Sequence, residues 1–254
     1  MSVLSATIRA RRGRRSEALE ALAEVAPEFL DAFDELLAAS TVHGTLAPKE
    51  RALIMVALTS TPTNLFAPSL RIHIRDALAH GASRQEIVEV FQLVSALGLH
   101  SCTFGVPVLF DEVAKSGQPI ALVNDTERAW MKDEFIRIRG YWGEFWDQVL
   151  TLSPAFFKAY LRFSTVPWEA GHVTPKVKEL IYIAIDSNTT HLYDQGLRVH
   201  IRGAMRQGAT ALEIMEVLQL AATLGMQTLD VGMPLLDEEI DRRAGEASGA
   251  TPIA

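Results

Sequence analysis

Two histidines, His73 and His200, are the side chains in this sequence best suited to acid–base chemistry. Imidazole titrates near neutral pH, so either ring could serve as a general acid or base. On a helix, the residues three and four positions away share the histidine's face, and most of these neighbours are small, including Ala77, Gly203 and Ala204. Small neighbours fit either the floor of a ligand pocket or a close helix crossing in which the histidine only packs.

The two histidines belong to a tandem repeat with a constant offset of 127 residues. Residues 70–98 align without a gap on residues 197–225, and about 16 of the 29 pairs are identical. The same offset superposes glycines and prolines outside this segment. We therefore expect two copies of one unit, at 1–118 and 126–245, with a flexible tail at 246–254.

Charged residues near the histidines offer partners for an anionic ligand. Arg71 and Arg198 precede the histidines by two residues, which is about 200° on a helix, so they point away from their own histidine and toward a neighbouring copy or subunit. A guanidinium suits a carboxylate, and a surface ion pair is the alternative. Glu179 has Ala52 as its counterpart, so a carboxylate working with histidine is possible only in the second copy.

Other candidate side chains are concentrated in the second copy. Most of its many aromatic residues have core or interface spacing, and an apolar substrate slot is the alternative, for which we select Trp142 and Tyr193. His100 and His191 have no histidine counterparts, since Gln227 and Asn64 match them. Their sequence spacing is not that of a metal-ligand pair, so the sequence predicts no metal site.

Helices position all of these side chains. Ser153-Pro154 and Thr174-Pro175 are typical helix starts, and Gly81 and Gly208 mark helix ends. Capping boxes follow at Ser83/Glu86 and Thr210/Glu213. Apolar residues then recur at helical spacing. The predicted fold is all-α, with helices near 16–26, 27–39, 48–61, 69–80, 83–100 and 104–116 and again 127 residues later.

Composition limits the partners. The 254 residues are 48% hydrophobic and carry a net charge of −7, which argues against a nucleic-acid-binding protein. One cysteine, Cys102, excludes an internal disulfide and fits a reducing compartment. We expect no membrane span and a cytoplasmic protein. The arginines at positions 9–15 suggest a helix start or oligomer arm, with a mitochondrial transit peptide as the alternative.

The repeat resembles the carboxymuconolactone decarboxylase and alkylhydroperoxidase D superfamily. The resemblance rests on HIRGAMRQGATALEIMEV and its copy HIRDALAHGASRQEIVEV, and on the upstream segments PKVKELIYIAI and PKERALIMVAL. It implies a tandem duplication of an alkylhydroperoxidase D-like helical unit, sites between units, and a homotrimer that imitates a hexamer. The family's peroxidase branch needs a CxxC pair, but Phe66 and Ser69, and Tyr193 and Gly196, stand at those positions, so thiol peroxidase activity is excluded.

The decarboxylase branch is the closer match. There a lactone bearing a carboxylate loses carbon dioxide without a cofactor, and the dienolate is protonated. The resemblance implies that His200 and His73 act as acid or base, that Arg198 and Arg71 hold the carboxylate, and that Glu179 matches a family glutamate. The segments SALGLHSC and ATLGMQTL replace a usual tyrosine-containing stretch, which leaves the substrate open.

The predicted function is therefore a cofactor-independent lyase or isomerase acting on a carboxylated lactone or a related enolisable acid. Two alternatives remain open. One is a hydrolase or hydratase of the same fold, and the other is a non-catalytic small-molecule-binding or assembly protein in which the histidines merely pack.

Overall fold

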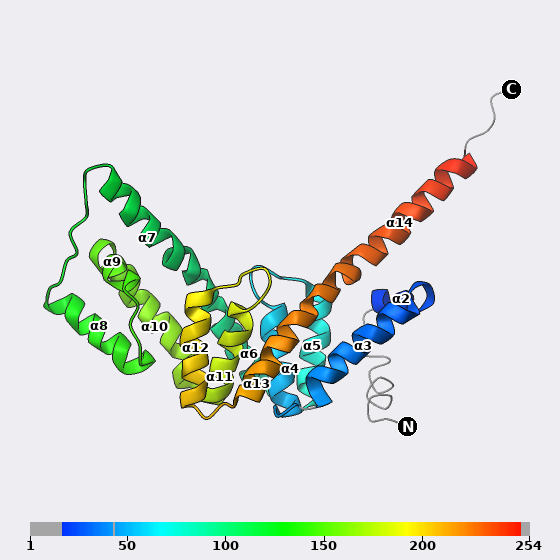
Figure 1. Cartoon of the computed structure of the whole chain (residues 1–254), viewed down its shortest axis with the longest axis horizontal. Helices are drawn as coiled ribbons and strands as arrows, with labels where there is room; N and C mark the ends of the chain where they lie inside the picture. The colour runs from blue at the N-terminus through cyan, green and yellow to red at the C-terminus, as the bar shows by residue number, and fades with distance from the viewer. Residues whose placement is uncertain (1–16, 43, 250–254) are drawn as a thin grey trace.

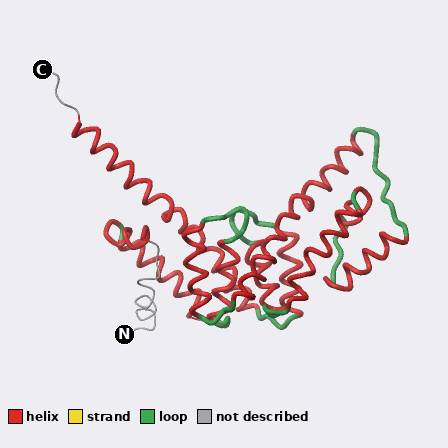
Figure 2. The backbone as a smooth tube through the Cα atoms, turned by 180° about the vertical axis from the view of Figure 1, so that it is seen from behind, coloured by secondary structure: helices red, strands yellow, loops and turns green. Residues whose placement is uncertain are grey.

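The structure is a computed structural model that describes residues 17–42 and 44–249. The N-terminal arginines lie outside the described residues, as do residues 250–254. Throughout the described part the chain forms helices and connecting loops, with no strand (Figure 2). The all-α prediction is confirmed.

The helices of the two repeats correspond one to one where both are described. The first repeat contains α2 (Glu17–Val25), α3 (Pro27–Val42), α4 (Pro48–Thr59), α5 (Ala67–Ala79), α6 (Arg84–Ser95), the 3₁₀ turn η1 (Ala96–Leu99) and α7 (His100–Lys115). The second contains α8 (Thr126–Arg139), α9 (Phe145–Leu152), α10 (Pro154–Ala170), α11 (Pro175–Asp186), α12 (Asp194–Arg206), α13 (Ala211–Ala222), η2 (Thr223–Met226) and α14 (Gln227–Gly249). The bounds of α5 and α12, and of α6 and α13, differ by the same 127 residues as the sequence repeat.

Local sequence signals account for these bounds. Gly81 and Gly208 have φ angles of 81° and 84°, the left-handed conformation that glycine adopts without steric cost. Ser83 and Thr210 then accept hydrogen bonds from the backbone N–H of Glu86 and Glu213, completing both predicted capping boxes. Each cap fixes the start of a helix that carries core residues.

The repeats are intertwined around one shared core. Helices α4, α5 and α6 pack with α11, α12 and α13, and their buried apolar residues form one cluster. The opening helices of each repeat lie on the other repeat, since α3 contacts α13 while α10 contacts α6. Likewise α2 lies against α14, and α9 against α7 (Figure 1). Elements of both repeats can therefore contribute to one site.

Two buried glutamates tie the repeats together. Glu89 accepts hydrogen bonds from the backbone N–H groups of His172 and Val173 and pairs with Lys178 at 2.9 Å, across the repeat boundary. Its counterpart Glu216 does the same for the other repeat, pairing with Arg51. Both glutamate side chains are buried, at 1% and 2% relative exposure.

One continuous helical stretch, Arg84–Lys115, has the length and composition of a helix that could cross a membrane. It consists of α6, η1 and α7. Most of its apolar residues in α6, including Val90 and Leu93, are buried in the shared core, whereas Val88 is exposed. Packing inside the protein therefore accounts for the apolar character of the α6 part.

Three features differ from the predicted helices. Helix α8 was not predicted, because its apolar residues are scattered among charges. The break predicted near residue 102 is absent, since η1 passes directly into α7. Helix α14 runs through Gly249, so the start of the segment predicted as a flexible tail is helical.

Candidate functional site

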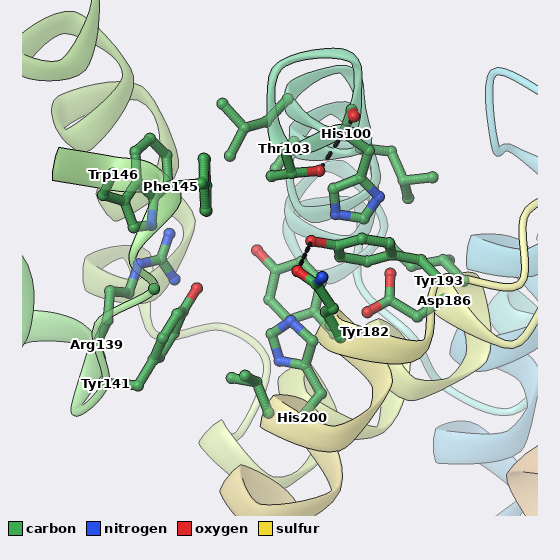
Figure 3. Close-up of a pocket in the computed structure, with 18 of the residues that line it drawn as sticks. His100, Thr103, Arg139, Tyr141, Phe145, Trp146, Tyr182, Asp186, Tyr193 and His200 are labelled. Carbon is green, nitrogen blue, oxygen red and sulfur yellow. Dashed lines mark hydrogen bonds between the residues drawn. The ribbon is translucent and has the colours of Figure 1, made fainter. Parts of the chain in front are cut away.

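A cavity of about 130 Å³ lies where η1 and the start of α7 meet the second repeat. Its walls come from η1 and α7, from the end of α8 and the loop that follows it, and from helices α9, α10, α11 and α12. Figure 3 shows the side chains that face it. The polar lining residues include His100, Thr103, Arg139, Tyr141, Trp142, Tyr160, Tyr182, Asp186, Tyr193, Gln195 and His200.

His200 and Glu179 meet beside this cavity. Nδ1 of His200 is 2.7 Å from Oε2 of Glu179, and both side chains are only slightly exposed, at 16% and 12%. The carboxylate, on α11, accepts a hydrogen bond from Nδ1 and so fixes the ring's tautomer and orientation. Nε2 is then the nitrogen available to a ligand. The two residues that were expected to work together are hydrogen-bonded.

The surroundings of His200 hold this pair in place. The Tyr182 ring stacks on the imidazole, with centroids 4.4 Å apart and planes 21° apart. A Cβ added at Gly203 would overlap the Glu179 carboxylate, so a larger residue there would displace it. In the first repeat Ala52 corresponds to Glu179 and Asp76 corresponds to Gly203, so the carboxylate is on the histidine's own helix and not on the neighbouring one. The combination of Glu179 with a glycine that leaves space for its carboxylate is thus present only in the second repeat.

His73 lies in a different environment from His200. Ala52 stands at the position that corresponds to Glu179, so the first repeat has no carboxylate there. His73 is also not among the residues that line the cavity. Burial lowers the pKa of His73 to about 4, while Asp76 opposes this effect. The ring is therefore neutral at physiological pH. Of the two repeat-related histidines, His200 lines the cavity and His73 does not.

The cation of the cavity is Arg139, which sequence analysis did not select. It is the one Lys or Arg among the lining residues, and its Nη2 donates to the carbonyl oxygen of Ser164 at 2.8 Å. Arg198 is exposed and pairs with Asp194, and Arg71 is exposed as well. Neither lines the cavity, so the structure does not bring the two predicted carboxylate-binding arginines to it. Arg139 ends α8, the helix that was not predicted.

Aromatic side chains form the wall opposite His200 and Asp186, as Figure 3 shows for Tyr141, Phe145 and Trp146. Trp142 and Tyr193, the two that the sequence selected, both line the cavity. Most of the remaining aromatics of the second repeat join a smaller core between α7 and α8–α10. Burial raises the pKa of Tyr141 to about 12, so its hydroxyl stays protonated and can donate a hydrogen bond. The wall is apolar with a few hydroxyl groups.

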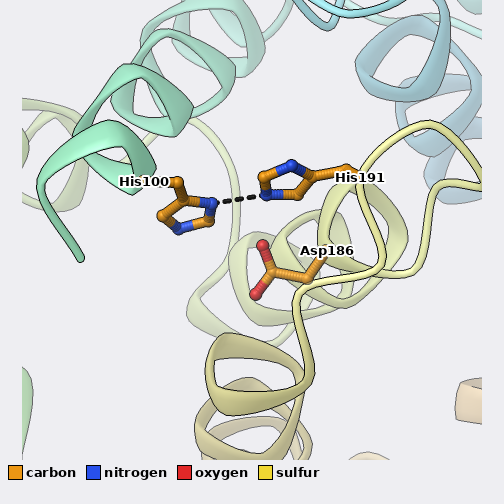
Figure 4. A group of neighbouring side chains, drawn as sticks. All are labelled: His100, Asp186 and His191. Atoms are coloured by element: carbon orange, nitrogen blue, oxygen red, sulfur yellow. Dashed lines mark hydrogen bonds between the residues drawn. The ribbon is translucent and has the colours of Figure 1, made fainter. Parts of the chain in front are cut away.

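A second polar cluster borders the same cavity. Nδ1 of His100, the first residue of α7, is 2.5 Å from Nε2 of His191, in the loop between α11 and α12. Asp186, the last residue of α11, lies beside them (Figure 4). Burial raises the pKa of Asp186 to about 8. Sequence spacing gave no sign of this cluster, because the two histidines are 91 residues apart and lie in different repeats.

Comparison with known proteins places the fold and the repeat in a family. The model of the carboxymuconolactone decarboxylase family matches twice, over residues 27–99 and 154–234. The chain belongs to this family. The double match coincides with the two repeats, so the family unit is present in tandem.

A crystal structure from Burkholderia xenovorans LB400 supports the same assignment. It is described as a "putative gamma-carboxymuconolactone decarboxylase subunit" and is 38% identical in sequence, with a TM-score of 0.89. The alignment covers 94% of this chain and 97% of the other. The likeness therefore extends over both repeats and the helices around the cavity. No curated protein matches the chain at a significant level.

Proposed function

We propose that this carboxymuconolactone decarboxylase family member is a lyase that removes carbon dioxide from a carboxylated lactone or a related enolisable acid, with an isomerase acting through the same enolate as the variant reaction. The observation that carries this proposal is the hydrogen bond between His200 and Glu179 at the edge of a cavity that also holds Arg139. An acid–base group and a carboxylate-binding cation thus share one ligand-sized space.

His200 is the proton donor in this reaction. When the bond between the lactone carbon and the carboxylate carbon breaks, its electron pair passes into the conjugated carbonyl, carbon dioxide leaves and a dienolate remains. The imidazolium of His200 then transfers a proton to carbon, and the ring regains one from water. Glu179 stabilises the imidazolium, as a carboxylate does beside a catalytic histidine. The net change is one proton taken up and one carbon dioxide released.

Arg139 is the group that binds the substrate carboxylate. Its bond to Ser164 uses one of five N–H donors, and the ring of Trp168 lies 5.5 Å from the guanidinium carbon. A guanidinium fixed in this way can present a fork of donors to an anion. The protonated hydroxyl of Tyr141, which lines the cavity, adds a neutral donor for the developing oxyanion.

Release of carbon dioxide tests this function. The purified chain is incubated with a set of carboxylated lactones, including carboxymuconolactone, and gas release is followed together with loss of the lactone. Removal of a general acid costs typically about 10²–10⁴-fold, so we expect His200→Gln to lower kcat by that range and Glu179→Gln to lower it less.

The repeat supplies the matched control for this experiment. His73→Gln removes the corresponding imidazole of the first repeat, which does not line the cavity and has Ala52 where His200 has Glu179. It should retain most of the activity. Equal losses in His73→Gln and His200→Gln, or full activity in His200→Gln, would refute the assigned role.

A further inference from the structure

The cluster of His100, Asp186 and His191 has the composition of a transition-metal site. Each residue offers one ligand atom, and the three atoms all lie within 4.8 Å of one another. Two imidazole nitrogens and one carboxylate oxygen form a common protein ligand set for Zn²⁺ and Fe²⁺, with further positions open to water or substrate. Neither Glu179 nor His200 belongs to this group.

The two imidazoles already point at each other. Their rings are nearly parallel, 3° apart, and the facing nitrogens are 2.5 Å apart. That separation is shorter than an ordinary hydrogen bond to nitrogen. Nitrogens bound to Zn²⁺ at about 2.0–2.1 Å would lie roughly 3–3.5 Å apart, so a shift of about an ångström would place an ion between them.

Asp186 provides the independent observation that points to a ligand. It is 1% exposed, and its Oδ2 has no hydrogen-bond partner within the described part of the chain. A buried polar atom without a partner is costly, and in native proteins it usually signals a functional role or an unseen ion. A Cβ at Gly196 would overlap this same oxygen, so the glycine keeps the space around the carboxylate open.

The repeat-related position, which is built from α14 of the second repeat and α4–α5 of the first, shows that this chemistry is not part of the scaffold. The counterparts of the three ligands are Gln227, Thr59 and Asn64, and none of them carries a charge. There Gln227 donates to Ser69, the counterpart of Gly196, so the equivalent space holds an ordinary hydrogen bond. The same helical framework thus supports a neutral polar pair at one junction between the repeats and the candidate ligands at the other.

The loop that carries His191 is also strained. The next residue, Leu192, has a φ angle of 45° and is the one non-glycine residue with positive φ among those described. Its counterpart Leu65 is also leucine but lacks this conformation. Left-handed backbone at a branched residue is sterically unfavourable and is concentrated at functional sites. This distortion accompanies the turn that directs His191 toward His100.

We propose that His100, His191 and Asp186 bind one divalent transition-metal ion, of which Zn²⁺ is the best fit, at the wall of the cavity. His100 and Asp186 line that cavity, so the ion's remaining coordination positions would face its interior and could take water or a carboxylate oxygen of a bound anion. The proposal does not depend on the lyase activity, because metal binding is measured without turnover.

Cobalt binding tests the site. The full-length chain is treated with chelator, dialysed and titrated with Co²⁺, whose visible absorption reports coordination by nitrogen and oxygen ligands; Zn²⁺ is then added in competition. We expect one Co²⁺ per chain, displaced by Zn²⁺, which binds such sites more tightly. Substitutions copied from the other repeat, His100→Gln, Asp186→Thr and His191→Asn, should each weaken Zn²⁺ binding at least about 100-fold.

Two controls make the result decisive. His80→Gln also copies the other repeat but changes an exposed histidine outside the cavity, so it should leave metal affinity unchanged. His200→Gln should leave it unchanged as well. Absence of stoichiometric binding would overturn the proposal and leave a short histidine–histidine hydrogen bond. Binding that survives all three substitutions, or is lost only in His200→Gln, would also overturn it. Circular dichroism is used to check that each variant is folded.

Discussion

At the scale of single residues, the two repeats differ by exchanges that come in pairs. Glu179 and Gly203 correspond to Ala52 and Asp76 in the first repeat. Asp186 and Gly196 correspond to Thr59 and Ser69. In both cases a carboxylate in the second repeat accompanies a glycine whose missing side chain leaves room for it. Comparison of paired positions therefore locates the chemistry better than either histidine does alone.

The first pair leads to a prediction for Gly203→Ala. The new methyl group would displace the Glu179 carboxylate and so release Nδ1 of His200. Alanine favours a helix over glycine by about 1 kcal/mol, so the variant should be as stable as the wild type or more so. The proposed decarboxylase activity should fall about 10–100-fold, the range seen when a supporting hydrogen bond is lost. Thermal unfolding and kcat are measured on the same samples; retained activity would contradict the role of the pair.

His73 leads to a prediction about acid stability. Burial lowers its pKa from 6.5 to about 4, so between these values the unfolded chain binds a proton that the folded chain does not. This contribution to stability is complete above pH 6.5 and is lost as the pH falls toward 4. Between pH 6.5 and 4, the free energy of unfolding of His73→Gln, measured with urea, should fall by about 1–3 kcal/mol less than that of the wild type. Data above pH 7 correct for altered packing, and parallel curves for the two proteins would contradict the prediction.

At the scale of elements, the cross-repeat glutamates matter most. Glu89 and its partner Lys178 are each 1% exposed, whereas Arg51, the partner of Glu216, is 21% exposed. Removing one member of a buried pair leaves an uncompensated charge, at a cost of about 3–5 kcal/mol. Glu89→Gln should therefore destabilise the protein by that amount and Glu216→Gln by clearly less. Urea unfolding measures the loss of stability in each variant. Equal losses in the two variants would show that burial of the ion pair does not determine the cost of breaking it.

The sequence predicted the helices better than the site, for a physical reason. Prolines, left-handed glycines and capping boxes act within a few residues, so the starts of α6 and α13 could be anticipated. Packing between repeats has no such local signal. It brings His100 to His191 and places Arg139, from a helix with scattered apolar residues, in the cavity. Arg198 was selected from its neighbourhood in sequence, and its helix turns it toward solvent.

At the scale of the whole molecule, the shared core predicts one unfolding event. Buried residues of both repeats, such as Leu58 and Ile185, belong to a single apolar cluster, and the opening helices of each repeat lie on the other. Neither half can bury its apolar face alone. Calorimetry should therefore give one transition with equal calorimetric and van't Hoff enthalpies. Two separable transitions would indicate independent repeats.

Self-association is the remaining prediction at this scale. Helices α7 and α14 extend away from the core on opposite sides (Figure 1), and matched positions on them are apolar and exposed. Phe104 is 76% exposed with Val231 as its counterpart, and Leu109 and Leu236 form a similar pair. Exposed apolar residues in matched places on two related arms are typical of surfaces covered by other copies of the chain.

We therefore expect a homotrimer, the state that the family resemblance implies for a fused pair of units. Light scattering coupled to gel filtration measures its mass directly. Phe104→Glu introduces a charge into the apolar surface of α7 and should shift the protein toward monomer. Ser116→Glu adds the same charge at the end of the same helix, beyond that surface, and should leave the trimer intact. A monomeric wild type, or equal dissociation of the two variants, would show that the arms have another purpose.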